Sequence, residues 1–269
     1  MIKLLKLEYT KFKNHSLILI LLMLYGIFST MTLFLGKEIR DLPDFMPSTS
    51  FLYKFPSTWD YLGFLGSMMS YFFLGLIAVF IVVNEITYKT FRQSIISGLT
   101  RKEFFLSKVY AIIAISLAAT AWYFLSGMLI GLTHTSNLRL SDIFDGGWVL
   151  PRFFIMVLGY MSLGLFIGFF IRKPGISLLF YLIWGFALEP GLKWLLTFKV
   201  INHGVVRLLP VNAMEDLMPL PFYRFADFVP DQGLEFEFLL PYWQAGLASV
   251  FWIIVFLFLG YRHFSTKDL

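Results

Sequence analysis

The chain has 269 residues, of which 58% are hydrophobic and only 14% are charged, and its mean hydropathy is +0.74. Soluble domains have about 25% charged residues, and a globule of this size cannot bury so much apolar surface. The composition therefore excludes a disordered chain, a nucleic-acid-binding domain and most soluble enzymes, and it indicates a membrane protein with several spans. The net charge of +5 needs no anionic partner, because Lys and Arg collect in cytoplasmic loops of membrane proteins.

Six stretches reach the length of about 20 mostly apolar residues that a membrane-spanning helix needs. In chain order they are residues 16–35, 61–83, 110–133, 152–171, 176–198 and 242–261. Ahead of them, residues 1–15 carry apolar side chains on one side of a helix and lysines on the other, and we expect this helix to lie in the membrane interface. The predicted fold is an all-α membrane protein with six transmembrane helices, an N-terminal interfacial helix and one transmembrane domain over residues 1–269.

Basic residues predict the orientation of these spans. With the N-terminus in the cytoplasm, six spans return the C-terminus there as well. The short segments on that side then hold thirteen of the 22 basic residues: Lys3, Lys6, Lys11, Lys13, Lys89, Arg92, Arg101, Lys102, Lys108, Arg172, Lys173, Arg262 and Lys267. Since basic residues near span ends determine topology, we expect a multi-pass protein of the inner (plasma) membrane with both termini in the cytoplasm.

The longest extracytoplasmic loop is predicted over residues 200–241, which contain several acids and prolines among apolar residues. Long loops in compact proteins are usually functional or disordered, and the Phe, Leu and Met content here argues against disorder. We expect short helices that either rest on the outer membrane face or dip into it.

Residues 84–108, between the second and third spans, form the only large cytoplasmic loop. The loop starts with Glu85 at the membrane border and is interrupted at Gly98. Thr100 is a suitable N-cap, and Glu103 three residues later completes the pattern of a capping box. The sequence predicts two short helices on either side of Gly98. They would either dock a soluble partner or merely fix the topology.

One family shares this pattern. The residues that carry the likeness are Glu85, Lys89, Thr90, Arg92, Gln93, Gly98, Thr100, Arg101, Phe104 and Lys108. Their spacing resembles the characteristic loop in the membrane subunits of ABC-2 type exporters. The six-span layout, the amphipathic N-terminal helix and the long last outer loop are also similar to that family.

The resemblance implies a permease subunit without cofactors of its own. A second permease subunit, the same or homologous, would pair with it, and each would rest on a cytoplasmic ATPase that binds and uses ATP. The loop would be the coupling element, and the resemblance assigns this role to Glu85, Arg92, Gly98, Thr100, Arg101, Lys102 and Phe104. Relatives of this layout move many kinds of cargo, so the substrate is not implied.

No catalytic or metal-binding pattern is found in the sequence. ATP binding needs G-x-x-x-x-G-K-[ST], but Gly36-Lys37 is followed by Glu38. The four histidines do not have the helical i, i+4 spacing of a zinc-hydrolase site, and there are no cysteines. The sequence therefore does not indicate an intramembrane enzyme, because it lacks the nucleophile or metal site that such an enzyme needs. The alternative of a stand-alone secondary transporter or channel would place more polar residues at the membrane midplane, and would carry internal repeats.

Two groups of residues within the spans leave alternatives open. Glu189 and Lys193 lie four residues apart in the fifth span, on either side of a kink expected at Pro190. They are either a gate or an ion pair where the helix leaves the membrane. The small residues Gly75, Ala78, Gly159, Gly164 and Gly168 predict close helix packing, within one chain or between two subunits.

Overall fold

The computed structural model describes residues 2–13, 15–35, 49–136, 139, 143, 148–199, 206–221 and 239–266, and these contain helices and no strand. The α-helices are α1 (Ile2–Lys13), α2 (Ser16–Leu35), α3 (Ser57–Met69), α4 (Gly75–Thr87), α5 (Thr90–Ile96), α6 (Arg101–His134), α8 (Val149–Ile171), α9 (Pro174–Ile183), α10 (Glu189–Lys199), α12 (Pro210–Glu215) and α14 (Tyr242–Thr266). A 3-10 turn, η1, covers Thr49–Tyr53, and single π-helical turns, η2 (Ser70–Leu74) and η3 (Trp184–Leu188), join α3 to α4 and α9 to α10.

Within the described part of the chain, five helical segments are long and apolar enough to cross a membrane: Ser57–Thr87, Arg101–His134, Val149–Ile171, Pro174–Leu196 and Tyr242–Thr266. The number rises to six if α1 and α2 are taken together as one bent span. In this pair α2 holds the apolar residues, and α1 lies at 89° to it. The prediction of an all-α membrane protein is confirmed. The perpendicular α1 has the placement expected of an interfacial helix.

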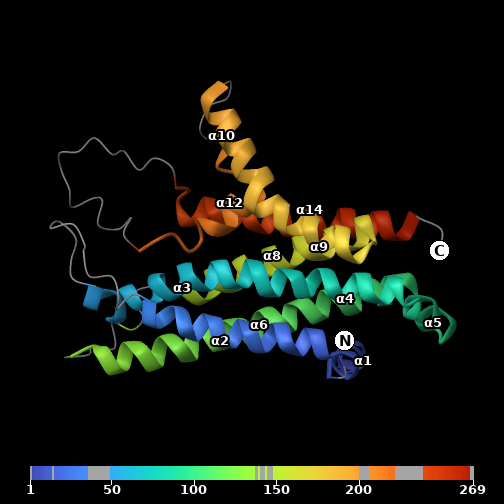
Figure 1. Cartoon of the computed structure of the whole chain (residues 1–269), viewed down its shortest axis with the longest axis horizontal. Helices are drawn as coiled ribbons and strands as arrows, with labels where there is room; N and C mark the ends of the chain where they lie inside the picture. The colour runs from blue at the N-terminus through green and yellow to red at the C-terminus, as the bar shows by residue number, and fades with distance from the viewer. Residues whose placement is uncertain are drawn as a thin grey trace.

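The helices form an elongated bundle in which α8 packs against α4, α6 and α14 (Figure 1). The start of α1, the short helix α5 and the end of α14 lie together at one end, which we name the α5 end. Helix α10 turns away from the bundle after η3 (Figure 1). Among the five long apolar segments of the described residues, the one containing α10 is the least buried, with 17% of its apolar stretch buried against 78% for the α3–α4 span.

Small residues bring α4 and α8 into close contact at the centre. A Cβ atom added to Gly164 would lie 2.6 Å from the carbonyl oxygen of Gly75 and 3.0 Å from the Cβ atom of Ala78. At Gly168 it would lie 3.1 Å from Val82. Of the two alternatives for these glycines, the structure places them in contacts within one chain. Side chains larger than glycine would force the two helices apart.

The described part of the predicted loop 200–241 dips into the bundle. Helix α12 is buried along most of its length and packs against α8 and α14. Met214 occupies the space left by Gly159, and Met218 occupies the space left by Gly63. Residues 200–205 and 222–238 lie outside the described residues.

The two spans that contain the π-helical turns η2 and η3 contact each other through a pair of tyrosines. The hydroxyl of Tyr71 donates to the carbonyl oxygen of Tyr181 at 2.6 Å, and the hydroxyl of Tyr181 donates to the carbonyl oxygen of Tyr71 at 2.9 Å. The two rings stack with centroids 4.7 Å apart. Gly75 and Gly185 leave room for the opposite hydroxyl groups. We name this arrangement the tyrosine pair.

The π-helical turn explains how the tyrosine pair forms. In η2 the N–H of Gly75 bonds to the carbonyl oxygen of Ser70, five residues earlier, instead of that of Tyr71. The carbonyl oxygen of Tyr71 is therefore available to the Tyr181 hydroxyl. Such turns interrupt α-helices at bends and functional sites. The α3–α4 and α9–α10 spans are thus joined at the places where both depart from α-helical geometry.

Candidate coupling site

At the α5 end, the chain between α4 and α6 turns twice. Lys89 has a left-handed conformation with φ of 57°, which separates α4 from α5. Gly98 has φ of 100°, a conformation that residues with side chains rarely adopt, and it separates α5 from α6. The prediction of a break at Gly98 is confirmed, and the interruption has a conformational cause.

The capping box at the start of α6 is also confirmed. The backbone N–H of Glu103 donates to the Thr100 hydroxyl at 3.2 Å, and the Glu103 carboxylate accepts from the Thr100 N–H at 2.9 Å. Helix α6 then runs without a break from Arg101 to His134. The expectation of a second short helix after Gly98 is therefore wrong, because this segment is the beginning of the third span.

A buried cluster of charges joins α1 to the ends of α4 and α6. Lys108 is fully buried, and its Nζ atom forms ion pairs with Glu8 at 2.7 Å and with Glu85. Lys11 lies 2.8 Å from Glu85 and 3.3 Å from Glu8. The Ser107 hydroxyl donates to Glu8 at 3.0 Å. We name these residues the charge cluster.

The charge cluster contains two cations and two carboxylates, so its formal charges cancel. Opposite charges at these distances are needed here, because an unpaired ion in a buried position costs several kcal/mol. The ring of Phe104 adds to the cation environment, with the Nζ atom of Lys108 5.1 Å from its centroid. As a result, the interfacial helix α1 is fixed to both spans that border the loop.

Helix α5 rests on an aromatic base. The ring of Phe91, its one buried residue, lies 4.6 Å from the ring of Phe104 in α6 and 5.1 Å from that of Phe264 in α14. Phe169 of α8 extends this base, 5.0 Å from Phe264. The contacts of Phe91 hold α5 against α6 and α14, and Phe169 supports Phe264 from α8.

The structure divides the predicted coupling residues into two groups. Glu85 and Phe104 are buried, at 8% and 1% exposure, and act inside the chain. Arg101 is half-buried, and its guanidinium donates to the carbonyl oxygen of Ser265 at 2.8 Å. The rings of Phe104 and Phe105 both lie in the core of this chain, so neither is exposed to a partner.

The second group is exposed at the α5 end. It consists of Arg92, Gly98, Thr100 and Lys102, and it is joined by the exposed residues Gln93 and Ile96. Ile96 is 86% exposed, and Tyr88, just before α5, is 73% exposed. Both of these exposed side chains were missed in the sequence analysis. The available signal was the short helix itself, because a helix that buries Phe91 exposes the side chains on its other faces. Together, Tyr88, Arg92, Gln93 and Ile96 form what we name the α5 surface.

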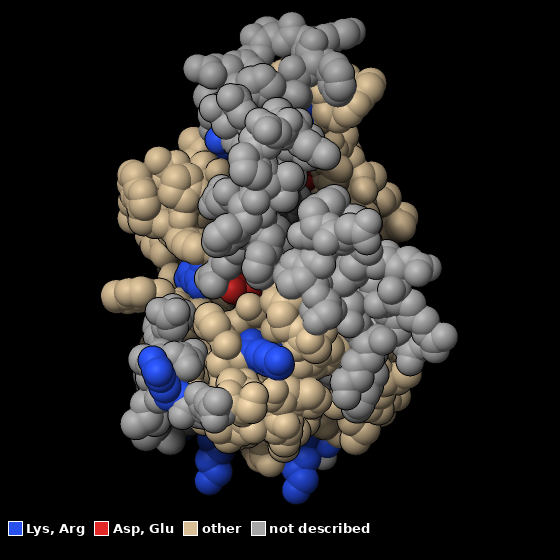
Figure 2. All heavy atoms as spheres, turned by 90° about the vertical axis from the view of Figure 1, so that its left-hand side faces the viewer, with Lys and Arg blue, Asp and Glu red and all other residues tan. Residues whose placement is uncertain are grey.

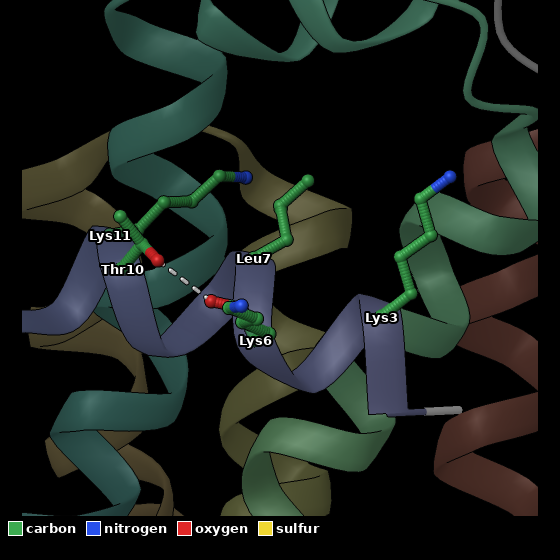
Figure 3. Close-up of a pocket in the computed structure, with 5 residues that line it drawn as sticks. All are labelled: Lys3, Lys6, Leu7, Thr10 and Lys11. Carbon is green, nitrogen blue, oxygen red and sulfur yellow. Dashed lines mark hydrogen bonds between the residues drawn. The ribbon is translucent and has the colours of Figure 1, made fainter.

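A basic cavity lies on the exposed side of α1 (Figure 3). Its volume is about 560 Å³, and Lys3, Leu7 and Lys11 project into it from the same side of the helix, with Lys6 and Thr10 beside them. The Thr10 hydroxyl donates to the carbonyl oxygen of Lys6 at 2.9 Å. Lys11 belongs to this cavity and to the charge cluster.

The predicted gate residues belong to a second polar group, at the opposite end. Glu189 is buried and accepts from the backbone N–H of Asn212 at 2.7 Å and from the indole N–H of Trp184 at 3.1 Å. Lys193 donates to the side-chain oxygen of Asn212. Asn212 thus connects both residues to α12, at the place where α10 leaves the bundle. Whether they act as a gate stays a prediction.

Asp216 completes this group. Its carboxylate accepts from the N–H of Leu240 and from the amide of Asn212, each at 3.1 Å. Burial raises the pKa of Asp216 to about 6, although the Leu240 N–H, Lys193 and Arg207 act in the opposite direction. The space-filling view of this end shows several basic side chains but very little acidic surface among the described residues (Figure 2).

No group of three or more His, Cys, Asp or Glu residues suited to a metal ion is found in the part of the chain that the structure describes. The two clusters are ion-pair and hydrogen-bond networks between helices. Together with the spans, they define the chain as a multi-pass all-α membrane protein whose charged residues connect helices at both ends of the bundle.

Comparison with known families agrees with this class. The family model described as ABC-2 family transporter protein matches residues 15–269. The chain therefore belongs to the ABC-2 family of transporter proteins. No similar sequence is found among proteins with curated descriptions.

Proposed function

We propose that the chain is the permease subunit of an ATP-binding cassette transporter, in which it forms the membrane path for export. A separate cytoplasmic subunit binds and hydrolyses ATP, and a second permease subunit, the same or homologous, completes the path. Membership of the ABC-2 family supports the permease role. The substrate is outside this proposal.

In this proposal the α5 end faces the cytoplasm of a cell whose inner (plasma) membrane holds the protein. The basic residues of the short segments favour this orientation. The start of α1 and the end of α14 lie at the same end of the bundle, as an even number of spans requires (Figure 1). Both termini are then cytoplasmic.

The observation that carries the proposal is the construction of the α5 surface. It presents Arg92, Gln93 and Ile96 to solvent, while Phe91 holds the same helix on the aromatic base. An exposed Ile beside an Arg has the composition of a protein interface centre, where apolar and guanidinium groups contribute most. A partner that binds and moves this surface would displace α4, α6 and α14 with it.

The test is co-purification of the chain with its ATPase subunit. Ile96→Glu places a charge in the centre of the contact, and we expect retention of the ATPase to fall at least about tenfold, which corresponds to 1.4 kcal/mol. Lys173→Glu, at an exposed position between α8 and α9, is the matched control and should retain the partner. If both variants retain the ATPase like the wild type, the α5 surface is not the docking site.

A further inference from the structure

A second cavity lies on the other side of α1, where α2 and α6 do not meet along their full lengths. Its volume is about 540 Å³. Leu19, Leu22 and Tyr25 of α2 form one wall, and small residues of α6, among them Ala114 and Ala118, form the other. Gly26 also borders it, and no side chain of another element reaches within 4 Å of a Cβ atom built there. We name this space the elbow cavity.

The elbow cavity is mainly apolar along the spans, where the hydroxyl of Tyr25 is bonded to Ser70, and it is charged at the α1 end. Tyr9 and Lys13 border that end, and both are exposed. At the other end, the indole N–H of Trp122 in α6 donates to the hydroxyl of Ser29 in α2 at 3.1 Å. An apolar space of this kind does not hold ordered water, which needs several polar partners.

The length of the cavity matches one leaflet of a bilayer. Its α6 wall runs from Ala111 to Trp122. At a rise of 1.5 Å per residue this is a length of about 16 Å. Half of the hydrocarbon core of a bilayer is about 15 Å. An acyl chain that starts at the interfacial helix α1 would therefore reach the Trp122–Ser29 contact.

The charge at the polar end of the elbow cavity determines which lipid headgroup is favoured there. Lys13 is the lysine that borders this end. The carboxylate of Glu8, which also borders the cavity, is occupied by Lys108 and Ser107. The free charge at that end is therefore positive. A phosphate group placed there gains attraction in the low dielectric of the interface.

We propose that the elbow cavity binds one anionic phospholipid, with an acyl chain between α2 and α6 and its phosphate beside Lys13. The bound lipid fills the gap between these two helices and joins α1 to the first span. This site is independent of the ATPase, so it stands or falls separately from the α5 surface.

The test measures lipid retained by the purified full-length chain. The protein is exchanged into detergent containing equal amounts of dioleoylphosphatidylglycerol and dioleoylphosphatidylcholine, and retained lipid is counted by native mass spectrometry. The variants Ala118→Leu and Ala114→Leu fill the cavity. Ala121→Leu makes the same substitution at an exposed position of α6 that does not border the cavity. Lys13→Gln removes the charge.

We expect the wild type and Ala121→Leu to retain one phosphatidylglycerol, and each cavity-filling variant to retain at least about tenfold less at an unchanged unfolding temperature. Lys13→Gln should keep a lipid but lose the preference for phosphatidylglycerol. Retention of phosphatidylglycerol by both cavity-filling variants at the wild-type level overturns the proposal. So does equal retention of the two lipids by the wild type, or retention of none.

Discussion

At the α5 end, Lys108 connects three helices through its side chain. Its ammonium group is fully buried between Glu8 of α1 and Glu85 of α4, while its own backbone belongs to α6. A buried ion pair adds little net stability, but the loss of one partner leaves the other charge without compensation. Lys108 thus contributes, together with Lys11 and Ser107, to the position of α1.

Replacing Lys108 by Met should destabilise the protein strongly. Glu8 and Glu85 would share Lys11 alone, and the loss of a partner from a buried pair costs about 3–5 kcal/mol. The unfolding temperature of purified Lys108→Met should fall well below that of Lys102→Met, which removes an exposed lysine from the same helix. Equal unfolding temperatures of the two variants would show that the charge cluster does not stabilise the fold.

Asp216 should make stability depend on pH. Its pKa is about 6 in the folded chain, above the ordinary value of 3.8. The folded state thus holds the Asp216 proton more tightly than the unfolded state, so the contribution of this carboxyl to stability is fully present below pH 3.8 and is lost as pH rises towards 6. The loss is about 3 kcal/mol at most.

Asp216→Asn should flatten this dependence. Asn cannot ionise, but its side-chain oxygen still accepts from the Leu240 N–H. Denaturant unfolding in the same detergent at several pH values between 4 and 7 measures the difference. A wild-type profile as flat as that of Asp216→Asn would mean that the carboxylate is not buried as described.

For single residues, contacts between positions close in the sequence were predictable, and contacts between distant positions were missed. The Thr100–Glu103 capping box lies within four residues and was predictable from its pattern. The contact between Lys108 and Glu8 joins residues 100 positions apart, which no local pattern specifies. Glu8 is nevertheless the one acid among the lysines of α1, and this was the available signal. Burial of Phe104 was missed because its partners lie in α5 and α14.

Among the elements, the tyrosine pair connects the α3–α4 span to the α9–α10 span, which are the most and the least buried of the five long apolar segments that the structure describes. Tyr71 follows the start of η2, and Tyr181 lies just before η3. Each hydroxyl bonds to a backbone carbonyl oxygen of the other span. Each bond therefore ties a side chain to the main chain of its neighbour, and the two spans can move at this level only together.

Gly75→Ala should disrupt the tyrosine pair, because the added methyl group would occupy the position of the Tyr181 hydroxyl. Displacing that hydroxyl leaves the carbonyl oxygen of Tyr71 unpaired, at a cost of about 1–3 kcal/mol. Gly246→Ala is the matched control, since nothing lies within 4 Å of its added Cβ atom and Ala favours a helix by about 1 kcal/mol over Gly. We expect thermal unfolding to shift in opposite directions, and equal shifts would contradict the tight contact.

The helices themselves follow from apolar runs, and their type was predictable. The π-helical turns and the continuity of α6 through the loop were not. The π-helical turn η2 coincides with a contact from another span, because the hydroxyl of Tyr181 bonds to the carbonyl oxygen of Tyr71, and no local pattern specifies that contact. The run from Arg101 to Lys108 is too polar to indicate a span, but the capping box starts a helix there that nothing interrupts before His134.

For the whole molecule, the orientation in the membrane is the first consequence to test. The chain has no cysteines, so single cysteines report single positions. Tyr88 and Trp148 are 73% and 79% exposed, near opposite ends of the bundle. A membrane-impermeant thiol reagent should label Trp148→Cys in right-side-out vesicles and Tyr88→Cys only in inverted ones. The reverse pattern would place the α5 end outside the cell.

Coupling to an ATPase is the central claim, and contact at α5 tests it most directly. Ile96→Cys, in a complex assembled with the ATPase subunit that still hydrolyses ATP, should form a cross-link to that subunit through a short thiol-to-amine reagent. Trp148→Cys, at the other end of the bundle, should form none. A cross-link from Ile96→Cys alone is the result that we predict. No cross-link from Ile96→Cys, Gln93→Cys or Arg92→Cys in an active complex would contradict it.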